Sequence, residues 1–262
     1  MSRFGNLEFE GDEEQRASKR SHPHAEGQKG EAHYLAEARS AFENGNFESA
    51  LRHYSKVLEF NPQNAAAWTG QVRMLIELGE CGEAKLWADK ALEKFPVEPE
   101  LLAAKAVALA RSGDLQGALA FSDSAITERG DTAYVWLARG DVLLARREAR
   151  ADFCFEKAIS FAPGDWYVVW LAGRIRYFYR QFALAVKLMQ QAVEANTGHF
   201  LLWLELGRCQ QALGLVGAAR HSYGQAKELN PCCADVTVAL TKLSQTGMGS
   251  RLRGWVWKIF NS

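Results

Sequence analysis

Apolar and polar positions alternate along most of this 262-residue chain with the spacing of α-helices. Apolar residues return on one side of each predicted helix, which indicates amphipathic helices that each bury one face. The pattern starts again about every 34 residues, and each period contains two such helices joined by a tight turn. The sequence therefore predicts an all-α array of repeated helix hairpins.

Three positions recur in register and define these hairpins. An alanine near the start of each second helix returns once in every period, and two further positions keep the same steps. The small residues allow the two helices of a pair to lie close together, while larger residues such as Tyr54, Phe155, Met189 and Tyr223 fill the gap. The three series are Ala50, Ala84, Ala118, Ala151, Ala185 and Ala219; Val57, Ala91, Ala125, Ala158, Ala192 and Ala226; and Pro62, Pro96, Gly130, Pro163, Thr197 and Pro231.

Turn residues predict where the helices end. The fourth repeat is one residue short at the turn between its helices and reads Arg146-Arg147-Glu148, without glycine. We therefore expect a distorted hairpin in that repeat. In four other repeats the first helix should stop at a glycine, because glycine adopts the left-handed helix cap without steric cost. These glycines are Gly45, Gly79, Gly113 and Gly214.

The last repeat resembles the tetratricopeptide repeat family. Its residues Trp203, Leu206, Gly207, Ala219, Tyr223 and Pro231 stand at the W-x2-L-G, A-x3-F and P spacings of that family. The resemblance covers residues 31–232 and implies a right-handed α-solenoid of about six tetratricopeptide helix hairpins plus a C-terminal capping helix. The expected repeats are 31–64, 65–98, 99–131, 132–164, 165–198 and 199–232, and the capping helix is expected at 233–246.

The resemblance also implies a binding surface, because the first helices of such arrays line a concave groove that receives segments of partner proteins. The residues expected on this face are Arg39, Arg73, Tyr134, Asp141, Trp170, Arg174, Tyr177, Phe178 and Arg208. Arginine donors match carboxylates bidentately, and aromatic rings hold apolar side chains or stack on arginines. We therefore expect the groove to bind a linear acidic-aromatic peptide segment. The alternative is that salt bridges with neighbouring glutamates of the same helix neutralise the arginines and that the aromatic rings simply pack between helices.

The tail formed by residues 1–30 is highly charged and differs from the array. It cannot bury a core, so it is expected to be disordered. Within it, three apolar residues stand beside five acidic ones, as in a docking motif; the alternative is an inert solvated tail. The residues concerned are Phe4, Leu7 and Phe9, and Glu8, Glu10, Asp12, Glu13 and Glu14.

The last residues, 247–262, form a basic amphipathic segment. If this segment is helical, its apolar residues share one face and its basic residues lie beside that face, which suits a membrane surface or a partner's groove. The alternative is that the segment folds back onto the array as further capping. The residues singled out are Arg251, Arg253, Trp255, Trp257, Lys258 and Phe260.

Composition and motifs narrow the function classes. The 31 basic and 31 acidic residues cancel, which argues against a nucleic-acid binder. The chain lacks a glycine-rich phosphate loop, a G-x-S-x-G elbow and an H-E-x-x-H motif, so no enzyme activity and no cofactor are expected. Its five cysteines lack metal-ligand spacing, so no metal is expected either. The start of the chain has no signal-peptide pattern, and a cytoplasmic location is expected.

These observations favour a non-enzymatic adaptor that binds other proteins through linear motifs. The alternative hypothesis is a self-assembling or membrane-surface-associated scaffold that uses its terminal segments, either as a homo-oligomer or on lipid.

Overall fold

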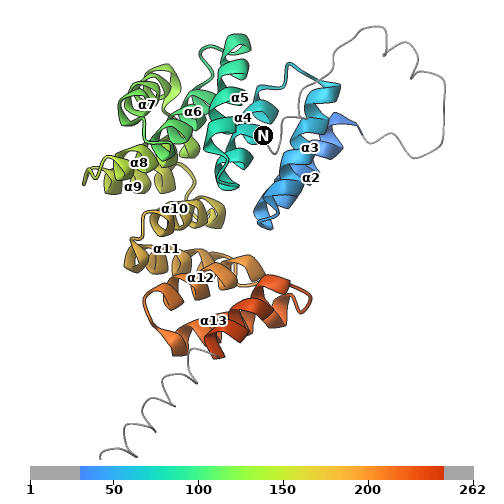
Figure 1. Cartoon of the computed structure of the whole chain (residues 1–262), viewed down its shortest axis with the longest axis vertical. Coiled ribbons are helices and arrows are strands. Elements are labelled where there is room, and N and C mark those ends of the chain that lie inside the picture. The colour runs from blue at the N-terminus through green and yellow to red at the C-terminus, as the bar shows by residue number, and fades with distance from the viewer. Residues whose placement is uncertain (1–29, 245–262) are drawn as a thin grey trace, which may run out of the picture. The chain divides into compact units, whose positions relative to one another are not determined.

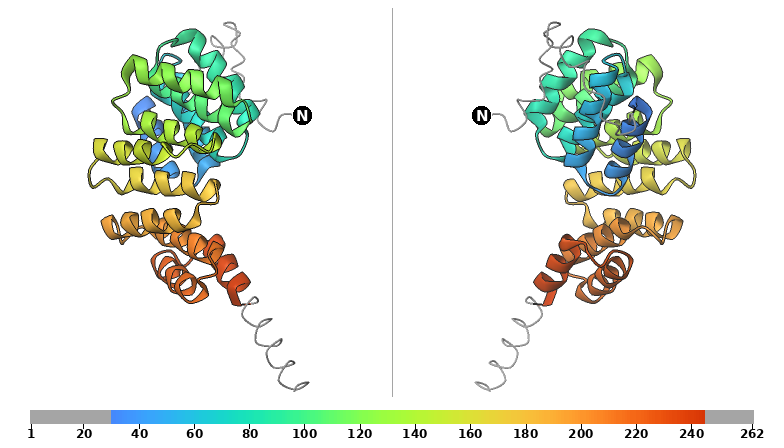
Figure 2. Two further views of the ribbon diagram at one scale, coloured as in Figure 1. Left: turned by 90° about the vertical axis from the view of Figure 1, so that its left-hand side faces the viewer. Right: turned by 90° about the vertical axis from the view of Figure 1, so that its right-hand side faces the viewer.

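A computed structural model of the chain describes residues 30–244 (Figure 1). Within this range every secondary-structure element is a helix, and the helices follow one another as antiparallel pairs. The chain forms two compact units, unit 1 within residues 1–161 and unit 2 within residues 162–262. Figure 2 shows the helix pairs of each unit from two further sides. Each unit is described by itself below.

Unit 1 contains four helix pairs in chain order. Each helix packs on the next along the unit, and the first helices α4, α6 and α8 also contact one another in sequence. This stacking brings side chains that are about one repeat apart within reach of each other. The helices are α2 (Glu31–Glu43), α3 (Phe47–Phe60), α4 (Ala65–Glu77), α5 (Cys81–Lys94), α6 (Pro99–Arg111), α7 (Leu115–Arg129), α8 (Ala133–Ala145) and α9 (Ala151–Phe161).

Unit 2 contains two helix pairs followed by a further helix over residues 234–244. That helix buries Val236 and Leu243, and side chains of α12 and α13 hydrogen-bond to it. The expected fold class, an all-α solenoid of six hairpins with a capping helix, is confirmed. The paired helices are α10 (Trp166–Phe178), α11 (Phe182–Ala195), α12 (Phe200–Ala212) and α13 (Val216–Leu229).

Polar side chains fix where several helices begin. Each accepts a hydrogen bond from a backbone N–H of the first turn, which satisfies a donor that has no partner inside the helix. At the other end, the predicted turn glycines adopt positive φ, for example 81° at Gly79. The capping residues are Asn46, Asn64, Asp114, Thr132 and Asp165.

The fourth hairpin is distorted at the start of its second helix rather than at the end of its first. Arg147 takes the place of the turn glycine with φ 60°, and its N–H donates to the carbonyl oxygen of Leu144 at 2.9 Å. The first helix therefore ends normally. The missing residue shortens α9, which begins at Ala151 and has 11 residues, whereas α13 has 14. Ala151 is the first residue of its helix, while the equivalent Ala219 is the fourth.

Close helix contacts explain the small residues of the repeat. Gly207 of α12 faces the ring of Tyr223 of α13, and a Cβ atom at position 207 would lie 2.5 Å from that ring. Gly140 of α8 faces the ring of Phe155 of α9 in the same way. The helices of these pairs therefore approach at glycine on one side and at a large ring on the other, as protein cores require at close packing.

Tryptophan side chains hold the turn that precedes alternate hairpins. Each of three indoles donates a hydrogen bond from Nε1 to the backbone carbonyl oxygen six residues earlier in the chain. Trp68 binds Pro62 at 2.9 Å and Trp203 binds Thr197 at 2.8 Å, while Trp136 binds Gly130. These bonds satisfy carbonyl groups between the end of one hairpin and the start of the next.

Candidate functional site

In unit 1, Arg73 lies among aromatic rings. Its guanidinium carbon is 3.9 Å from the centre of the Tyr134 ring and 5.1 Å from that of Phe42. These rings belong to α8 and α2, so the contact links three first helices of the unit. Desolvation raises the pKa of the Tyr134 phenol well above its usual value, and the phenol is neutral at pH 7. The arrangement is a cation–π cluster that holds Arg73 in place.

Asp141 is buried in unit 1, and its carboxylate is paired with Arg111. Only 1% of its side chain is exposed, and Nη2 of Arg111 lies 2.7 Å from its Oδ2. Nε of Arg111 also donates to Oδ2 at 3.2 Å, so the pair ties α6 to α8. Arg39, by contrast, is 82% exposed and lies 4.0 Å from Glu43 one turn away in α2. An exposed pair at this distance adds little to stability.

In unit 2, Trp170 and Arg174 share one carboxylate. Trp170 is fully buried, and its Nε1 donates to Oε2 of Glu205 at 2.8 Å. Arg174 donates to Oε1 of the same carboxylate and also lies over the Trp170 ring, with 5.2 Å between the guanidinium carbon and the ring centre. Glu205 belongs to α12, so both residues of α10 bind across to the next hairpin. This cluster stabilises the contact between two hairpins.

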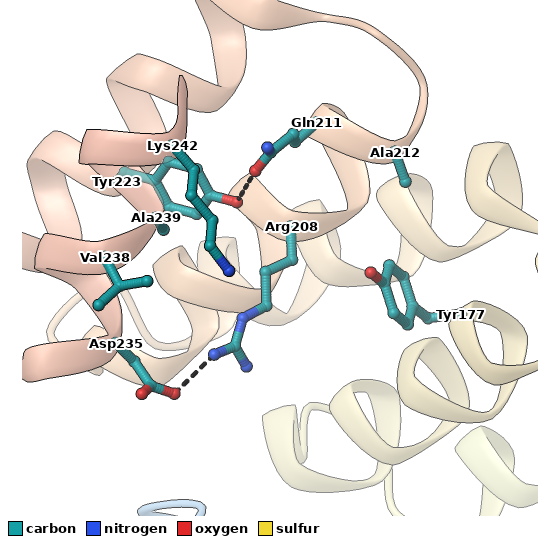
Figure 3. Close-up of a pocket in the computed structure, with 9 residues that line it drawn as sticks. All are labelled: Tyr177, Arg208, Gln211, Ala212, Tyr223, Asp235, Val238, Ala239 and Lys242. Carbon is teal, nitrogen blue, oxygen red and sulfur yellow. Dashed lines mark hydrogen bonds and ion pairs between the residues drawn. The ribbon is translucent and has the colours of Figure 1, made fainter. Parts of the chain in front are cut away.

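Arg208 lies in a pocket of about 500 Å³ in unit 2 (Figure 3). Nη2 of Arg208 donates to Oδ2 of Asp235 at 2.7 Å, while its side chain stays 39% exposed. In the close-up, the side chains of Arg208 and Lys242 point into the same space from two neighbouring helices. The pocket is lined by Tyr177, Arg208, Gln211, Ala212, Tyr223, Asp235, Val238, Ala239 and Lys242.

Two tyrosines line this pocket as neutral phenols. Burial raises the pKa of Tyr223 to about 12, and it raises the pKa of Tyr177 as well. The Tyr223 hydroxyl donates to Oε1 of Gln211 at 2.7 Å. The phenols add hydrogen-bonding groups and ring surface without adding negative charge. With Arg208 and Lys242 beside them, the pocket suits a carboxylate next to an apolar or aromatic group.

The remaining predicted groove residue, Phe178, lies outside the pocket lining. It is 52% exposed and contacts Tyr179 edge to face, with 5.0 Å between the ring centres. Among the predicted residues, the structure thus brings together Arg73 with Tyr134, Trp170 with Arg174, and Tyr177 with Arg208. Each of these groups lies within one unit.

Sequence reasoning missed several residues of these groups. Lys242 carried a readable signal, because Arg174, Arg208 and Lys242 follow one another at the same step of one repeat. Lys242 was missed because equivalent positions were compared only within the six repeats, which end at residue 232. The acidic partners Glu205 and Asp235, and Arg111, carried no comparable signal, since they stand at different positions of the period.

The six C-terminal residues proposed for membrane or partner contact, the acidic N-terminal segment and the tail 1–29 lie outside the described residues. No helix within residues 30–244 is long and apolar enough to cross a membrane. The same range holds no group of three or more His, Cys, Asp or Glu side chains placed to bind a metal ion.

Comparison with known families gives one family model. A model described as tetratricopeptide repeat matches residues 35–99 and 75–131. The matched segments lie in unit 1, whereas the family spacings are clearest in the last repeat of unit 2.

Comparison with individual proteins gives distant relatives. BBSome complex member BBS4 of Bos taurus is 22% identical over 189 residues, which are 72% of this chain and 36% of the relative. The chain thus spans about a third of that protein's length. A thermophilic tetratricopeptide repeat protein of Thermus thermophilus aligns with 82% of this chain and 99% of its own, at TM-score 0.50 and 16% identity. A chain of the APC/C hetero-tetramer Cut9–Hcn1 covers 82% of this chain at TM-score 0.48, with 49% of its own length and 16% identity.

Proposed function

We propose that this chain, which a tetratricopeptide repeat model matches over residues 35–131, is a non-enzymatic adaptor that binds a linear acidic-aromatic segment of a partner protein in the pocket of unit 2. The observation that carries this proposal is the pair of cations in that pocket. Arg208 and Lys242 line one cavity together with the phenol of Tyr177. A carboxylate side chain can meet the cations while a neighbouring aromatic side chain contacts the ring.

The other predicted groove residues support a site centred on this pocket. Arg174 and Asp141 are held by ion pairs with Glu205 and Arg111, and Arg73 is held between two aromatic rings. Breaking such buried or part-buried contacts costs free energy, so these side chains stabilise the fold and are less suited to bind a ligand. Arg208 is more exposed than Arg174, with 39% against 20% of its side chain accessible. It is therefore better placed to meet a partner.

Asp235 tunes the proposed site, because it is already a carboxylate on Arg208. An incoming carboxylate must compete with it or share the guanidinium, which has five N–H donors. Replacement of Asp235 by Asn would remove a negative charge from the pocket. We expect Asp235→Asn to bind acidic segments more tightly than the wild type. This gain in affinity distinguishes specific binding at Arg208 from non-specific binding.

The test is a quantitative pull-down from cell extract with three forms of the full chain. The pocket variant Arg208→Glu, Lys242→Glu should lose the specific partners of the wild type, while circular dichroism shows unchanged helicity. The control variant Lys187→Glu, Arg220→Glu makes the same change of charge at two exposed residues of α11 and α13 that do not line the pocket. It should keep the partners.

Retention of the same partners by the pocket variant would contradict the proposal. Recovered partners should also share a segment in which Asp or Glu stands beside Phe, Tyr or Trp. A synthetic peptide of that segment should bind the Asp235→Asn variant more tightly than the wild type, and weaker binding to that variant would count against Arg208 as the contact.

A further inference from the structure

The chain itself contains a segment with the chemistry that the pocket accepts. Residues 4–14, which lie outside the described part of the structure, read FGNLEFEGDEE and hold five acidic and no basic side chains. Phe9 stands between Glu8 and Glu10, and Phe4 and Leu7 come shortly before them. An aromatic side chain next to a carboxylate is the combination for which the pocket offers Tyr177 and two cations.

We propose that residues 4–14 of a second copy of this chain bind in the unit 2 pocket, so that copies associate head to tail. This inference rests on the proposed function, because it uses the same pocket and the same ligand chemistry. It commits to one occupant, a segment of the chain itself. Since the segment and the pocket are different surfaces, a dimer formed in this way leaves one segment and one pocket open for further copies.

The distribution of charge favours unit 2 as the docking place. Residues 30–161 hold 15 basic and 20 acidic side chains, a net charge of −5, whereas residues 162–244 hold eight basic and five acidic side chains, a net charge of +3. A segment of charge −5 is repelled by the first range and attracted by the second. This attraction is screened by salt, so the association should weaken as ionic strength rises.

Details of the pocket agree with an acidic-aromatic occupant. Lys242 is exposed, and the side chain of Arg208 is 39% exposed and donates one hydrogen bond from Nη2 to Asp235. Val238 is half exposed and lines the same cavity, which gives Phe or Leu of the segment an apolar contact. Carboxylates can thus face the two cations while the apolar side chains of the segment lie against Val238 and Tyr177.

The first experiment is sedimentation of the full chain over a series of concentrations at low salt. The wild type should show a sedimentation coefficient that rises with concentration. The pocket variant Arg208→Glu, Lys242→Glu should stay monomeric. So should a segment variant with Glu8, Glu10, Glu13 and Glu14 changed to Gln and Asp12 changed to Asn. The control variant Lys187→Glu, Arg220→Glu should associate as the wild type does.

A mixture of the two defective variants gives the sharper result. The pocket variant keeps an intact segment, and the segment variant keeps an intact pocket. An equal mixture should therefore form dimers and stop there, because each copy supplies only one working half. Failure of the mixture to form dimers, or continued association of the pocket variant alone, would overturn the inference. A wild type that stays monomeric at every concentration would also overturn it.

A labelled peptide of residues 4–14 separates this inference from the proposed function. Its dissociation constant for the segment variant should rise at least about tenfold when the pocket charges are reversed. If this peptide does not bind but an acidic-aromatic peptide from a pulled-down partner does, the self-association inference fails and the proposed function stands. If neither peptide binds the pocket, both fail.

Discussion

Two arginines adopt a backbone conformation that glycine holds elsewhere in the chain. Arg147 and Arg180 both have φ 60° at the turn after a first helix, where Gly79 and Gly214 stand in other hairpins. For a residue with a Cβ atom, this left-handed conformation costs roughly 1–2 kcal/mol. Both side chains are exposed, so glycine at these positions would lose few contacts.

We expect Arg147→Gly to raise the free energy of unfolding by about 1 kcal/mol, because the left-handed cost is removed and only part of it returns as flexibility of the unfolded chain. Urea denaturation would measure the change. Arg220→Gly is the matched control, since Arg220 is exposed within α13, where glycine should lower stability by about 1 kcal/mol. A loss of stability in Arg147→Gly would show that the arginine side chain matters more than its backbone.

His199 should make the stability of unit 2 depend on pH. Its ring lies 4.8 Å from that of Trp166, centre to centre, and burial lowers its pKa. The unfolded chain therefore takes up the proton at a higher pH than the folded chain. The contribution of neutral His199 is fully present above the ordinary histidine pKa of about 6.5 and is lost as the pH falls through the lower folded value.

The measurement is the urea midpoint of the wild type and of His199→Phe at about pH 7.5 and about pH 5.5, on either side of the ordinary histidine pKa. The wild type should lose more stability on acidification than His199→Phe, which cannot be protonated at this position. Equal losses in the two proteins would show that His199 is already solvated in the folded state.

Single residues also mark what could be predicted from the sequence. Arg73 and Tyr134 were expected on one face because their positions in the repeat could be read from the sequence. The ion pairs of Arg174 and Arg208 were not predicted, because the partner of Arg174 comes from the next hairpin and that of Arg208 from the helix after the last hairpin. Such pairing depends on how hairpins stack and on which way long side chains turn, and periodicity contains neither.

At the scale of helices, the contact between α12 and α13 depends on the absence of one carbon atom. We expect Gly207→Ala to destabilise the protein by about 1–3 kcal/mol, because the new Cβ would lie 2.5 Å from the ring of Tyr223. Tyr223 also lines the pocket, so ligand binding should weaken with it. Thermal unfolding and peptide binding would measure the two effects.

Gly224→Ala is the control for that change. Gly224 lies in the same helix as Tyr223 and has open space where a Cβ atom would stand. Alanine is a better helix former than glycine by about 1 kcal/mol, so this variant should be more stable than the wild type. Destabilisation by both changes would mean that α13 tolerates no added volume at all.

The helices themselves were largely legible, because three independent series marked the same period. The fourth repeat is the exception. Its missing residue predicted a distorted hairpin, but the sequence did not show which part of the hairpin would be distorted. The distortion could fall on the end of α8 or on the start of α9, and Arg147 decided the outcome by accepting the left-handed turn.

At the scale of the whole molecule, two compact units should respond separately to local damage. We expect Gly207→Ala to speed amide hydrogen exchange within residues 162–244 and to leave protection within residues 30–129 unchanged. Opening of the nearest hairpins needs less free energy than opening of the whole chain. Hydrogen exchange followed by mass spectrometry would locate the change, and faster exchange throughout both ranges would show a single cooperative unit instead.

The bonds of Trp68, Trp136 and Trp203 bear on how such a chain could be lengthened. They stand in every second hairpin, two repeats apart, while the equivalent positions between them hold Tyr34, Leu102 and Val169. The smallest piece that reproduces itself fully is thus two hairpins long. A designer who duplicates one hairpin would set two junctions of the same kind side by side, whereas an inserted pair would preserve the alternation.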